Sequence, residues 1–351
     1  DNRIFVKECR SLQAAGYDVS WVVQNERDEV VDGVQIVAVR PTKSRLRRWL
    51  FSGWEAYRKA RQTDADLYHF HDPEFIPFAL LLWLSGRKVV YDIHEDYVSS
   101  VSQKFYIPAP LRWILSRFVG AIEKLFTSPF TLVIAERYYE QRFPHATKVL
   151  NYPRIAESEQ RCARSESQLL YTGKVHLYRG AKIHARIPSI VPGTSVTFVG
   201  RCSHRLHSDL QAEFREYRSQ LSFTGIGENV PFQEILNQYT QGSWLAGLAI
   251  FPPNEHLRQK ELTKFFEYMQ FGLPIIASDF PTWRQLIEEN GCGICVDPND
   301  EDAIAEAVCK LRDDPDLWES MASSGLSTVR DKYAWRTQEA ELLRLYQRLL
   351  Q

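Results

Sequence analysis

The segment GKVHLYRG at residues 173–180 combines two glycines with two fixed cations, Lys174 and Arg179. Glycine lets the backbone approach a ligand closely, and the turn leads into the amino terminus of a predicted helix, where negative charge is favoured. The spacing matches neither GxGxxG nor GxxxxGKS/T, which speaks against a dinucleotide fingerprint or a P-loop. We predict a diphosphate site that includes Gly173, Lys174 and Arg179. Two surface cations on an ordinary loop are the alternative.

The segment TKFFEYMQFGLP at residues 263–274 reads as a short helix followed by a stop. Thr263 is expected to cap this helix, and Gly272 to end it. Lys264 falls in the first turn, where a cation opposes the helix dipole, so a bound anion is expected to offset the mismatch. Glu267 lies one turn further on and can accept hydrogen bonds from a ribose diol. An ordinary i,i+3 ion pair on a surface helix is the alternative.

Two polar clusters in the first half of the chain directly follow predicted strands. His71 and Asp72 belong to the sequence FHDPE, and His94, Glu95 and Asp96 belong to VVYDIHEDY. In an open parallel sheet, ligands bind beyond the carboxyl ends of the strands. The clusters therefore predict a second set of site residues, with His94 either catalytic or a satisfied loop histidine.

The composition sets limits on the class of protein. The chain has 351 residues, of which 44% are hydrophobic, and this predicts two cores rather than one. A net charge of -1 gives no global field for nucleic acid or an anionic membrane, so anion binding must be local. The six scattered cysteines predict reduced thiols in a cytoplasmic protein without a metal site. The longest apolar stretch, residues 75–84, has about half the length of a membrane span.

The elements that must position these residues alternate between strand and helix. The chain opens in a helix over residues 4–15, so the first strand of the sheet and its loop are expected to be missing. A polar linker is expected at residues 157–167, after which the strand–helix alternation restarts. The predicted strands cover residues 19–23, 34–39, 66–70, 89–93, 132–135 and 147–150 before the linker, and 169–172, 195–199, 221–224, 245–251, 274–278 and 293–296 after it. The pattern predicts an α/β protein with two doubly wound domains and an amphipathic final helix over residues 335–350.

With these motifs in this order, the sequence resembles the retaining GT-B glycosyltransferases of family 4, the group 1 class. The resemblance is strongest over residues 263–298 and extends to YTGKVHLYRG, FHDPE and VVYDIHEDY, so it covers nearly the whole chain. It implies two Rossmann-like domains facing each other across a cleft. Residues 1–160 would form the acceptor-side domain and 161–332 the nucleotide-sugar-binding domain. The helix in 333–351 would cross back to the first domain.

The resemblance also implies roles for single residues. His94 would reach the donor sugar near its reactive carbon and, with Lys174, would be catalytic. The diphosphate would be held by Gly173, Lys174, Arg179 and Lys264, and the ribose or sugar by Glu267, Thr263 and Glu261. Arg3, His71, Asp72, Glu95 and Asp96 would lie on the acceptor side. The donor would be a nucleoside diphosphate sugar, used without a metal or other cofactor.

The chain departs from the family pattern at the usual Glu-x7-Glu pair. Glu267 is the second acid, but Gln259 stands in the place of the first, and the nearby Glu261 has the wrong spacing. A non-catalytic nucleotide-sugar-binding scaffold subunit therefore stays open as an alternative. A GT-B sugar-nucleotide epimerase or phosphorylase is a second alternative, although the motifs of those enzymes are not found in the sequence.

Tryptophans among basic residues suggest the kind of acceptor. Trp49 and Trp54 lie in a basic segment, and Trp113 lies beside Arg112 and Arg117. Basic and aromatic residues together are typical of a membrane interface. This favours a lipid-linked or polysaccharide precursor of the cell envelope, at the cytoplasmic face of a membrane. Core packing of the tryptophans is the alternative.

Overall fold

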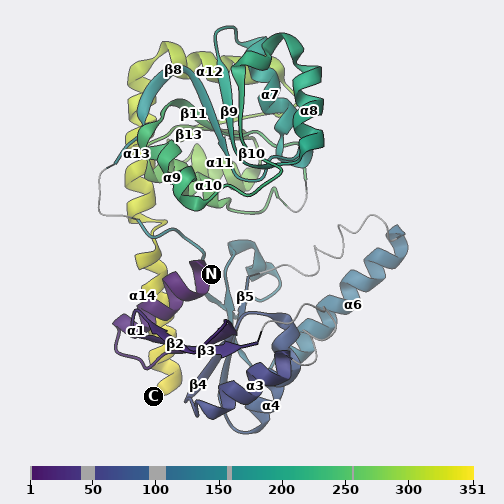
Figure 1. The fold of residues 1–351 in the computed structure, drawn as a ribbon, viewed down its shortest axis with the longest axis vertical. Helices are drawn as coiled ribbons and strands as arrows, with labels where there is room; N and C mark the ends of the chain where they lie inside the picture. The colour runs from purple at the N-terminus through teal and green to yellow at the C-terminus, as the bar shows by residue number, and fades with distance from the viewer. Residues whose placement is uncertain (1, 41–51, 95–107, 156–159, 255–256) are drawn as a thin grey trace. The chain divides into compact units, whose positions relative to one another are not determined.

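Short apolar runs of the chain pair into parallel sheets in two separate units. The computed structural model describes residues 2–40, 52–94, 108–155, 160–254 and 257–351. Unit 1 comprises Asp1–Asn151 together with Trp335–Gln351, and unit 2 comprises Tyr152–Ala334 (Figure 1). Each unit has its own sheet system and core. The predicted α/β class with two Rossmann-like domains is confirmed.

Unit 2 contains a six-stranded sheet in which all neighbouring strands are parallel, in the order β10-β9-β8-β11-β12-β13. The strands are β8 Ala163–Thr172, β9 Ser195–Cys202, β10 Leu221–Ile226, β11 Ser243–Ala249, β12 Ile275–Ser278 and β13 Gly293–Val296. The α-helices are α7 Ala181–Ile190, α8 His204–Glu213, α9 Phe232–Gln241, α10 Thr263–Gln270, α11 Pro281–Ile287, α12 Glu301–Asp313 and α13 Pro315–Asp331. Short 3-10 helices cover η5 Leu177–Arg179 and η6 Arg215–Gln220. Central strand residues such as Leu170, Phe198 and Leu248 are fully buried, as expected for a parallel sheet flanked by helices.

Unit 1 contains a parallel four-stranded sheet in the order β4-β5-β6-β7 and a three-stranded sheet in the order β1-β3-β2, whose β2 is antiparallel to β3. The strands are β1 Ser20–Gln24, β2 Glu29–Val31, β3 Val34–Val39, β4 Leu67–Phe70, β5 Lys88–Ile93, β6 Thr131–Ile134 and β7 Thr147–Lys148. The α-helices are α1 Arg10–Ala14, α3 Gly53–Gln62, α4 Ile76–Leu84, α6 Ala109–Thr127 and α14 Trp335–Leu350. A π-helix, η1 Asn2–Cys9, precedes α1, and 3-10 helices cover η3 Pro73–Phe75 and η4 Arg137–Gln141.

The last helix, α14, packs into the core of unit 1. Its buried residues Trp335, Leu342 and Leu345 join one apolar cluster with Val90 and Val133 from the sheet. The Trp335 indole nitrogen also donates a hydrogen bond to Ser11 Oγ at 2.9 Å. The apolar face that the sequence leaves on this helix is thus covered within unit 1.

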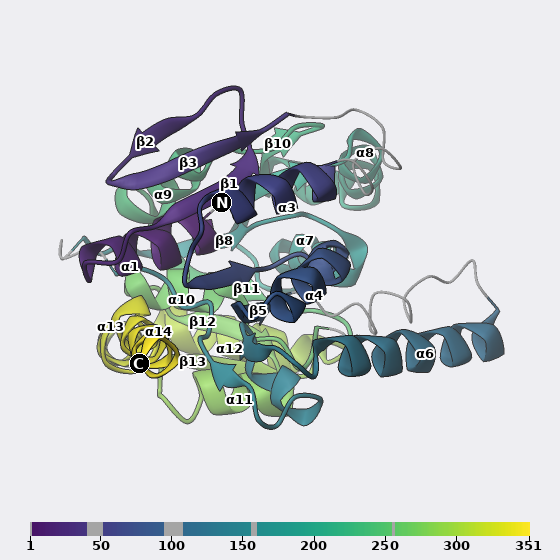
Figure 2. The same ribbon diagram turned by 90° about the horizontal axis from the view of Figure 1, so that it is seen from below.

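Helix α6 extends away from the rest of unit 1 in both views (Figures 1 and 2). Several of its large apolar side chains are exposed, including Leu111, Trp113, Ile114 and Leu125. Among the described residues, no helix combines the length and hydropathy needed to cross a membrane.

One local expectation is wrong, and one strand was not expected. The segment 157–167 is not a linker throughout, because β8 already begins at Ala163. These first residues of β8 are exposed or half-buried, and Ala163 and Arg164 pair with Ser243 and Trp244 of β11. Strand β2 is absent from the predicted set; it has only three residues and pairs at the edge of its sheet.

Candidate functional site

The sheet order of unit 2 identifies where a ligand site belongs. From β8 the chain moves outward to β9 and β10, and it then returns to β11 on the other side of β8 and continues to β12 and β13. Parallel sheets of this kind bind ligands at the carboxyl ends of the two central strands, where the strand order reverses. Here those strands are β8 and β11. Gly173 follows β8 directly, and the segment after β11 leads into α10.

The segment after β8 has the tight backbone that its glycines predict. Gly173 and Gly180 have positive φ angles of 98° and 75°. A Cβ atom on Gly180 would lie 1.8 Å from the carbonyl oxygen of Ile250, so only glycine fits there. Gly180 is also the N-cap residue of α7, which confirms that the turn leads into a helix amino terminus.

The two cations of this segment differ in their surroundings. Lys174 is exposed, whereas Arg179 is half-buried and lies 5.9 Å from the centre of the Tyr178 ring. The Arg179 Nε atom is buried and has no hydrogen-bond partner in the part of the chain that the structure describes. A buried guanidinium nitrogen in that state is available for an anionic ligand.

Lys264 is the most unusual cation of unit 2. Its side chain is 7% exposed, and its Nζ atom has no hydrogen-bond partner among the described residues. The Nζ atom lies 3.6 Å from the centre of the Tyr171 ring, and 3.9 Å from the position that a Cβ atom on Gly173 would take. Burial, followed by the positive charge of Arg179, lowers the pKa of Lys264 well below its ordinary value, while Glu267 acts in the opposite direction. The alternative of an exposed ion pair on a surface helix is therefore wrong, because Lys264 is buried.

Glu267 is half-buried on the same helix, α10, and is held by a neighbouring element. The Tyr239 hydroxyl on α9 lies 2.9 Å from Glu267 Oε2. Of the other predicted ribose or sugar residues, Glu261 lies 3.3 Å from the Tyr152 hydroxyl, while Thr263 is exposed. Thr263 does not cap α10: the N-cap residue is Leu262, in an extended conformation, and no side chain caps this end. Thr263 is already the first helical residue, so its hydroxyl stands one position too late.

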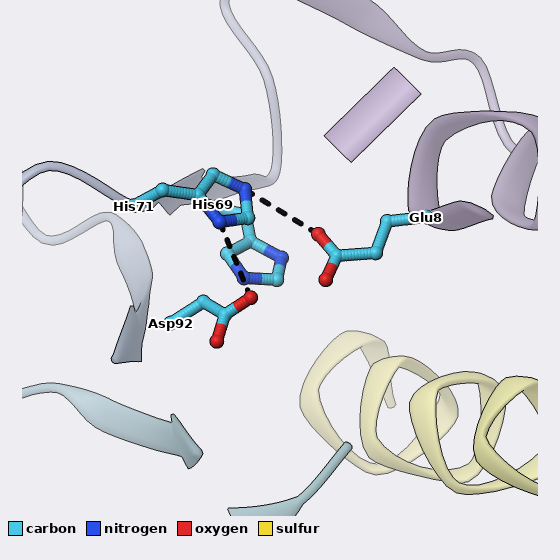
Figure 3. Close-up of side chains that lie close together, drawn as sticks. All are labelled: Glu8, His69, His71 and Asp92. Atoms are coloured by element: carbon cyan, nitrogen blue, oxygen red, sulfur yellow. Dashed lines mark ion pairs between the residues drawn. The ribbon is translucent and has the colours of Figure 1, made fainter. Parts of the chain in front are cut away.

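In unit 1, a buried polar cluster joins the first turn of the chain to the ends of β4 and β5. Arg3 lies 2.7 Å from Asp92 Oδ2 and 3.2 Å from Glu8 Oε1. His71 bridges the same two acids, with Nδ1 3.2 Å from Asp92 and Nε2 3.4 Å from Glu8 (Figure 3). Arg3 and Glu8 are five positions apart on η1, and a π-helix brings residues at that spacing together.

The two acids of this cluster shift in opposite directions. Burial raises the pKa of Glu8 well above its ordinary value, and the nearby Asp92 carboxylate adds to the effect. Burial would also raise the pKa of Asp92, but Arg3 and His71 outweigh it and hold that pKa below its usual range. Asp92 is therefore the ionised partner of Arg3, and Glu8 is the group that retains a proton more readily.

Two further histidines adjoin the cluster. His69 stacks on His71 with ring centres 4.8 Å apart, and its Nδ1 atom lies 2.8 Å from the Tyr346 hydroxyl on α14. Burial, followed by the charge of His71, lowers the pKa of His69 to about 3, so this ring is neutral. His94 is half-buried, with its ring centre 5.8 Å from that of His71.

Glu8, His69, His71 and Asp92 offer ligand atoms that lie within 4.8 Å of one another, a grouping that could hold a metal ion. The guanidinium of Arg3, however, already contacts both carboxylates. It supplies the positive charge that a metal ion would bring and would repel a divalent cation at this distance. Arg3 therefore makes the cluster an ion-pair network rather than a favourable cation site.

The structure thus brings some predicted residues together and separates others. Arg3, His71 and His94 form one group in unit 1, and the end of β8 and α10 bring Gly173, Arg179 and Lys264 together in unit 2. Asp72 is exposed beside the first group, and Glu95 and Asp96 lie outside the described residues.

Sequence reasoning missed Glu8, Asp92 and Tyr239. Asp92 had a usable signal, since it is a single acid inside the apolar run VVYDI. The other two carry no comparable signal, because only the fold shows that Glu8 faces β5 or that Tyr239 faces α10.

Comparison with known proteins identifies the family of the chain. A family model described as Glycosyltransferase Family 4 matches residues 2–142, and one described as Glycosyl transferases group 1 matches residues 194–327. A sucrose synthase from Acidithiobacillus caldus is 31% identical over 81 residues. That match covers 22% of this chain and 10% of the enzyme, so the chain spans only a small part of this relative.

Solved structures resemble the chain over most of its length. A sucrose-phosphate synthase from Thermosynechococcus elongatus has a TM-score of 0.72 at 16% identity, covering 99% of this chain and 93% of the other. HepE from Anabaena, crystallised in complex with UDP, has a TM-score of 0.64 at 13% identity, covering 90% and 86%. At these identities the likeness shows the shared GT-B fold.

Proposed function

Because the chain belongs to the group 1 glycosyltransferases of family 4, we propose that it moves a sugar from a nucleoside diphosphate sugar to an acceptor hydroxyl with retention at the anomeric carbon. The observation that carries the donor assignment is the buried Lys264, whose Nζ atom has no hydrogen-bond partner in the described part of the chain. A buried cation in this state favours an anionic ligand. The UDP in the HepE structure is a ligand of that chemical class.

We also propose a catalytic role for the cations of unit 2. Negative charge builds up on the diphosphate as its bond to the anomeric carbon breaks. Fixed cations that meet this charge stabilise the transition state more than the ground state. We assign this role to Lys174, Arg179 and Lys264, and we assign the ribose hydroxyls to Glu267.

In unit 1 we assign a catalytic role at the transferred sugar to His94. Arg3 and His71 belong to the acceptor side in this proposal. Both side chains contact the buried Asp92 carboxylate, which fixes their positions. The transfer is proposed to need no metal ion, since the cations named above serve the leaving group.

We propose a lipid-linked or polysaccharide acceptor of the cell envelope, reached by peripheral contact with the cytoplasmic face of a membrane. Two observations support it. Trp113 on α6 is 62% exposed beside exposed Leu111 and Ile114, and the Arg117 guanidinium lies 5.2 Å from its ring centre. Trp54 on α3 is half exposed, although it also packs against Tyr57 and Phe78. Trp49, Arg45, Arg47 and Arg48 lie outside the described residues.

Vesicle co-sedimentation tests the membrane part. Trp113→Ala together with Arg117→Ala is expected to reduce binding to vesicles that contain anionic lipid, whereas His207→Ala on unit 2 serves as the control. Equal sedimentation of wild type with and without lipid would remove this part of the proposal.

A panel of nucleotide sugars tests the donor part. The protein is incubated with each sugar and candidate acceptors, and release of nucleoside diphosphate is measured. One donor is expected to be consumed, and Lys174→Ala is expected to lower turnover by orders of magnitude. The matched control is Lys182→Ala, which removes an exposed lysine on α7 that pairs with Glu213. Full activity of Lys174→Ala would contradict the assigned diphosphate contact, and binding without turnover across the panel would contradict the transfer.

A further inference from the structure

Tyr239 connects the two segments of unit 2 that carry the proposed donor contacts. Its side chain is fully buried, and its ring stacks on Phe271 with centres 4.9 Å apart. Its hydroxyl oxygen lies 2.9 Å from Glu267 Oε2 on α10 and 2.8 Å from Thr172 Oγ1 at the end of β8. Thr172 immediately precedes Gly173 and Lys174, so one hydroxyl touches both segments.

The number of protons fixes the direction of these hydrogen bonds. A tyrosine hydroxyl has one proton to donate, and an ionised carboxylate can only accept. Tyr239 therefore donates to Glu267, which leaves its oxygen to accept the proton of Thr172 Oγ1. A hydrogen bond to a charged carboxylate is the stronger of the two and favours this direction.

The series of hydrogen bonds continues from Thr172 into the sheet. The backbone N–H of Thr172 donates to the Tyr268 hydroxyl at 3.2 Å. The Tyr268 hydroxyl in turn lies 3.3 Å from the carbonyl oxygen of Leu248 on β11. The hydrogen bonds thus run from the two central strands of the sheet through Tyr239 to Glu267. Every residue of this network is buried except Glu267, which is half-buried.

On this basis we propose that Tyr239 is a positioning residue that holds the Glu267 carboxylate in the orientation required to bind the ribose hydroxyls of the donor nucleotide. The proposal rests on the proposed function, because it takes a nucleoside diphosphate as the ligand. It also predicts a selectivity: the hydroxyl of Tyr239 increases the affinity for ribonucleotides and does not affect the affinity for nucleotides that lack ribose hydroxyls.

The test measures binding of UDP, GDP and the matching dideoxyribonucleoside diphosphates by calorimetry. Tyr239→Phe removes only the hydroxyl and keeps the stacked ring. It is expected to weaken binding of the preferred ribonucleotide about tenfold, from loss of one hydrogen bond to a charged group, and to leave dideoxy binding unchanged. Tyr268→Phe is the matched control, since it removes a buried hydroxyl of the same network that bonds the backbone of Thr172, Leu170 and Leu248. It is expected to change the affinities for both kinds of nucleotide equally.

A second comparison separates positioning from general stability. In a Glu267→Ala background, Tyr239→Phe is expected to add no further loss of ribonucleotide affinity, because two residues that act through one contact are not additive. Additive losses, or an equal loss for ribo- and dideoxyribonucleotides, would overturn the role of Tyr239 while leaving the donor site in place. Failure of the wild-type protein to bind any of these nucleotides would overturn the donor assignment and this inference together.

Discussion

The ammonium nitrogen of Lys264 lies 3.6 Å from the centre of the Tyr171 ring, within the range of a cation–π contact. Tyr171 is at the end of β8 and Lys264 is at the start of α10, so the contact joins a central strand of the unit 2 sheet to the helix between β11 and β12. An aromatic face compensates only part of the lost hydration of a buried ammonium group. Lys264 is therefore costly in the free protein and favourable when an anion is bound.

Replacement of Lys264 by methionine should separate these two effects. Lys264→Met keeps most of the side-chain volume and removes the buried charge, so the free protein is expected to become more stable by about 1 kcal/mol or more. Binding of the nucleoside diphosphate is expected to weaken about 10- to 100-fold. Urea unfolding and calorimetry measure the two quantities.

The exposed Lys182 provides the control for this substitution. Its ion pair with Glu213 is on the surface, so Lys182→Met is expected to change stability by less than about 0.5 kcal/mol and to leave nucleotide binding intact. A destabilised Lys264→Met protein with normal nucleotide affinity would show that Lys264 serves the fold rather than a ligand.

The pH dependence of stability should report the same lysine. Its pKa in the folded protein is lowered from the ordinary value of 10.5, first by burial and then by Arg179. Between the lowered pKa and 10.5 the unfolded chain binds more protons than the folded chain, so unfolding free energy rises with pH in this window. Urea midpoints of the free protein measured from neutral to alkaline pH are expected to rise more steeply in wild type than in Lys264→Met. Parallel curves would contradict the assignment.

Gly180 should be the least replaceable residue of the segment after β8. An alanine there would need a positive φ and would place its Cβ atom 1.8 Å from the Ile250 carbonyl oxygen. Gly193 also has a positive φ, but a Cβ atom there meets nothing within 4 Å. Gly193→Ala is expected to cost about 1 kcal/mol from backbone strain alone, and Gly180→Ala about 3 kcal/mol or more. Equal unfolding free energies of the two variants would contradict the close packing.

Much of the fold could be predicted because local pattern and tertiary packing agree. Strands β3 and β13 and helix α14 were predicted with the bounds observed, since each is an apolar run or an amphipathic repeat with clear ends. The start of β8 could not be predicted, because the polar residues before Leu169 look like a linker. Ala163 and Arg164 pair with the distant β11, and Gln168 pairs with β9.

The candidate sites were less accessible than the fold. Lys264 was singled out by its conflict with the helix dipole, but its burial depends on Tyr171 and Phe251, which belong to other elements. The partnership of Arg3 with Asp92 spans 89 positions and carries no local signal. Sequence periodicity shows which residues share a face of one helix or strand, whereas such contacts depend on how different elements pack.

The ion pair of Arg3 gives a last prediction, which also tests whether a metal ion is needed. Arg3→Met removes the cation that contacts Asp92 and Glu8 and leaves two buried carboxyl groups facing His71. Loss of one partner from a buried pair typically costs about 3–5 kcal/mol. The matched control is Arg10→Met, because Arg10 pairs with Asp32 at 3.5 Å on the surface and is expected to contribute less than about 1 kcal/mol. Urea unfolding measures both variants.

Chelation distinguishes the ion pair from a metal site in the same cluster. If Arg3 is the only cation that the acids require, EDTA is expected to leave the melting temperature of the wild-type protein unchanged, and added Zn²⁺ to leave it unchanged as well. A bound ion that stabilised the folded state would raise the melting temperature, and by more as its free concentration rises above its Kd. A fall in melting temperature with EDTA, reversed by Zn²⁺, would therefore show that Glu8, His69, His71 and Asp92 hold a metal despite the guanidinium beside them.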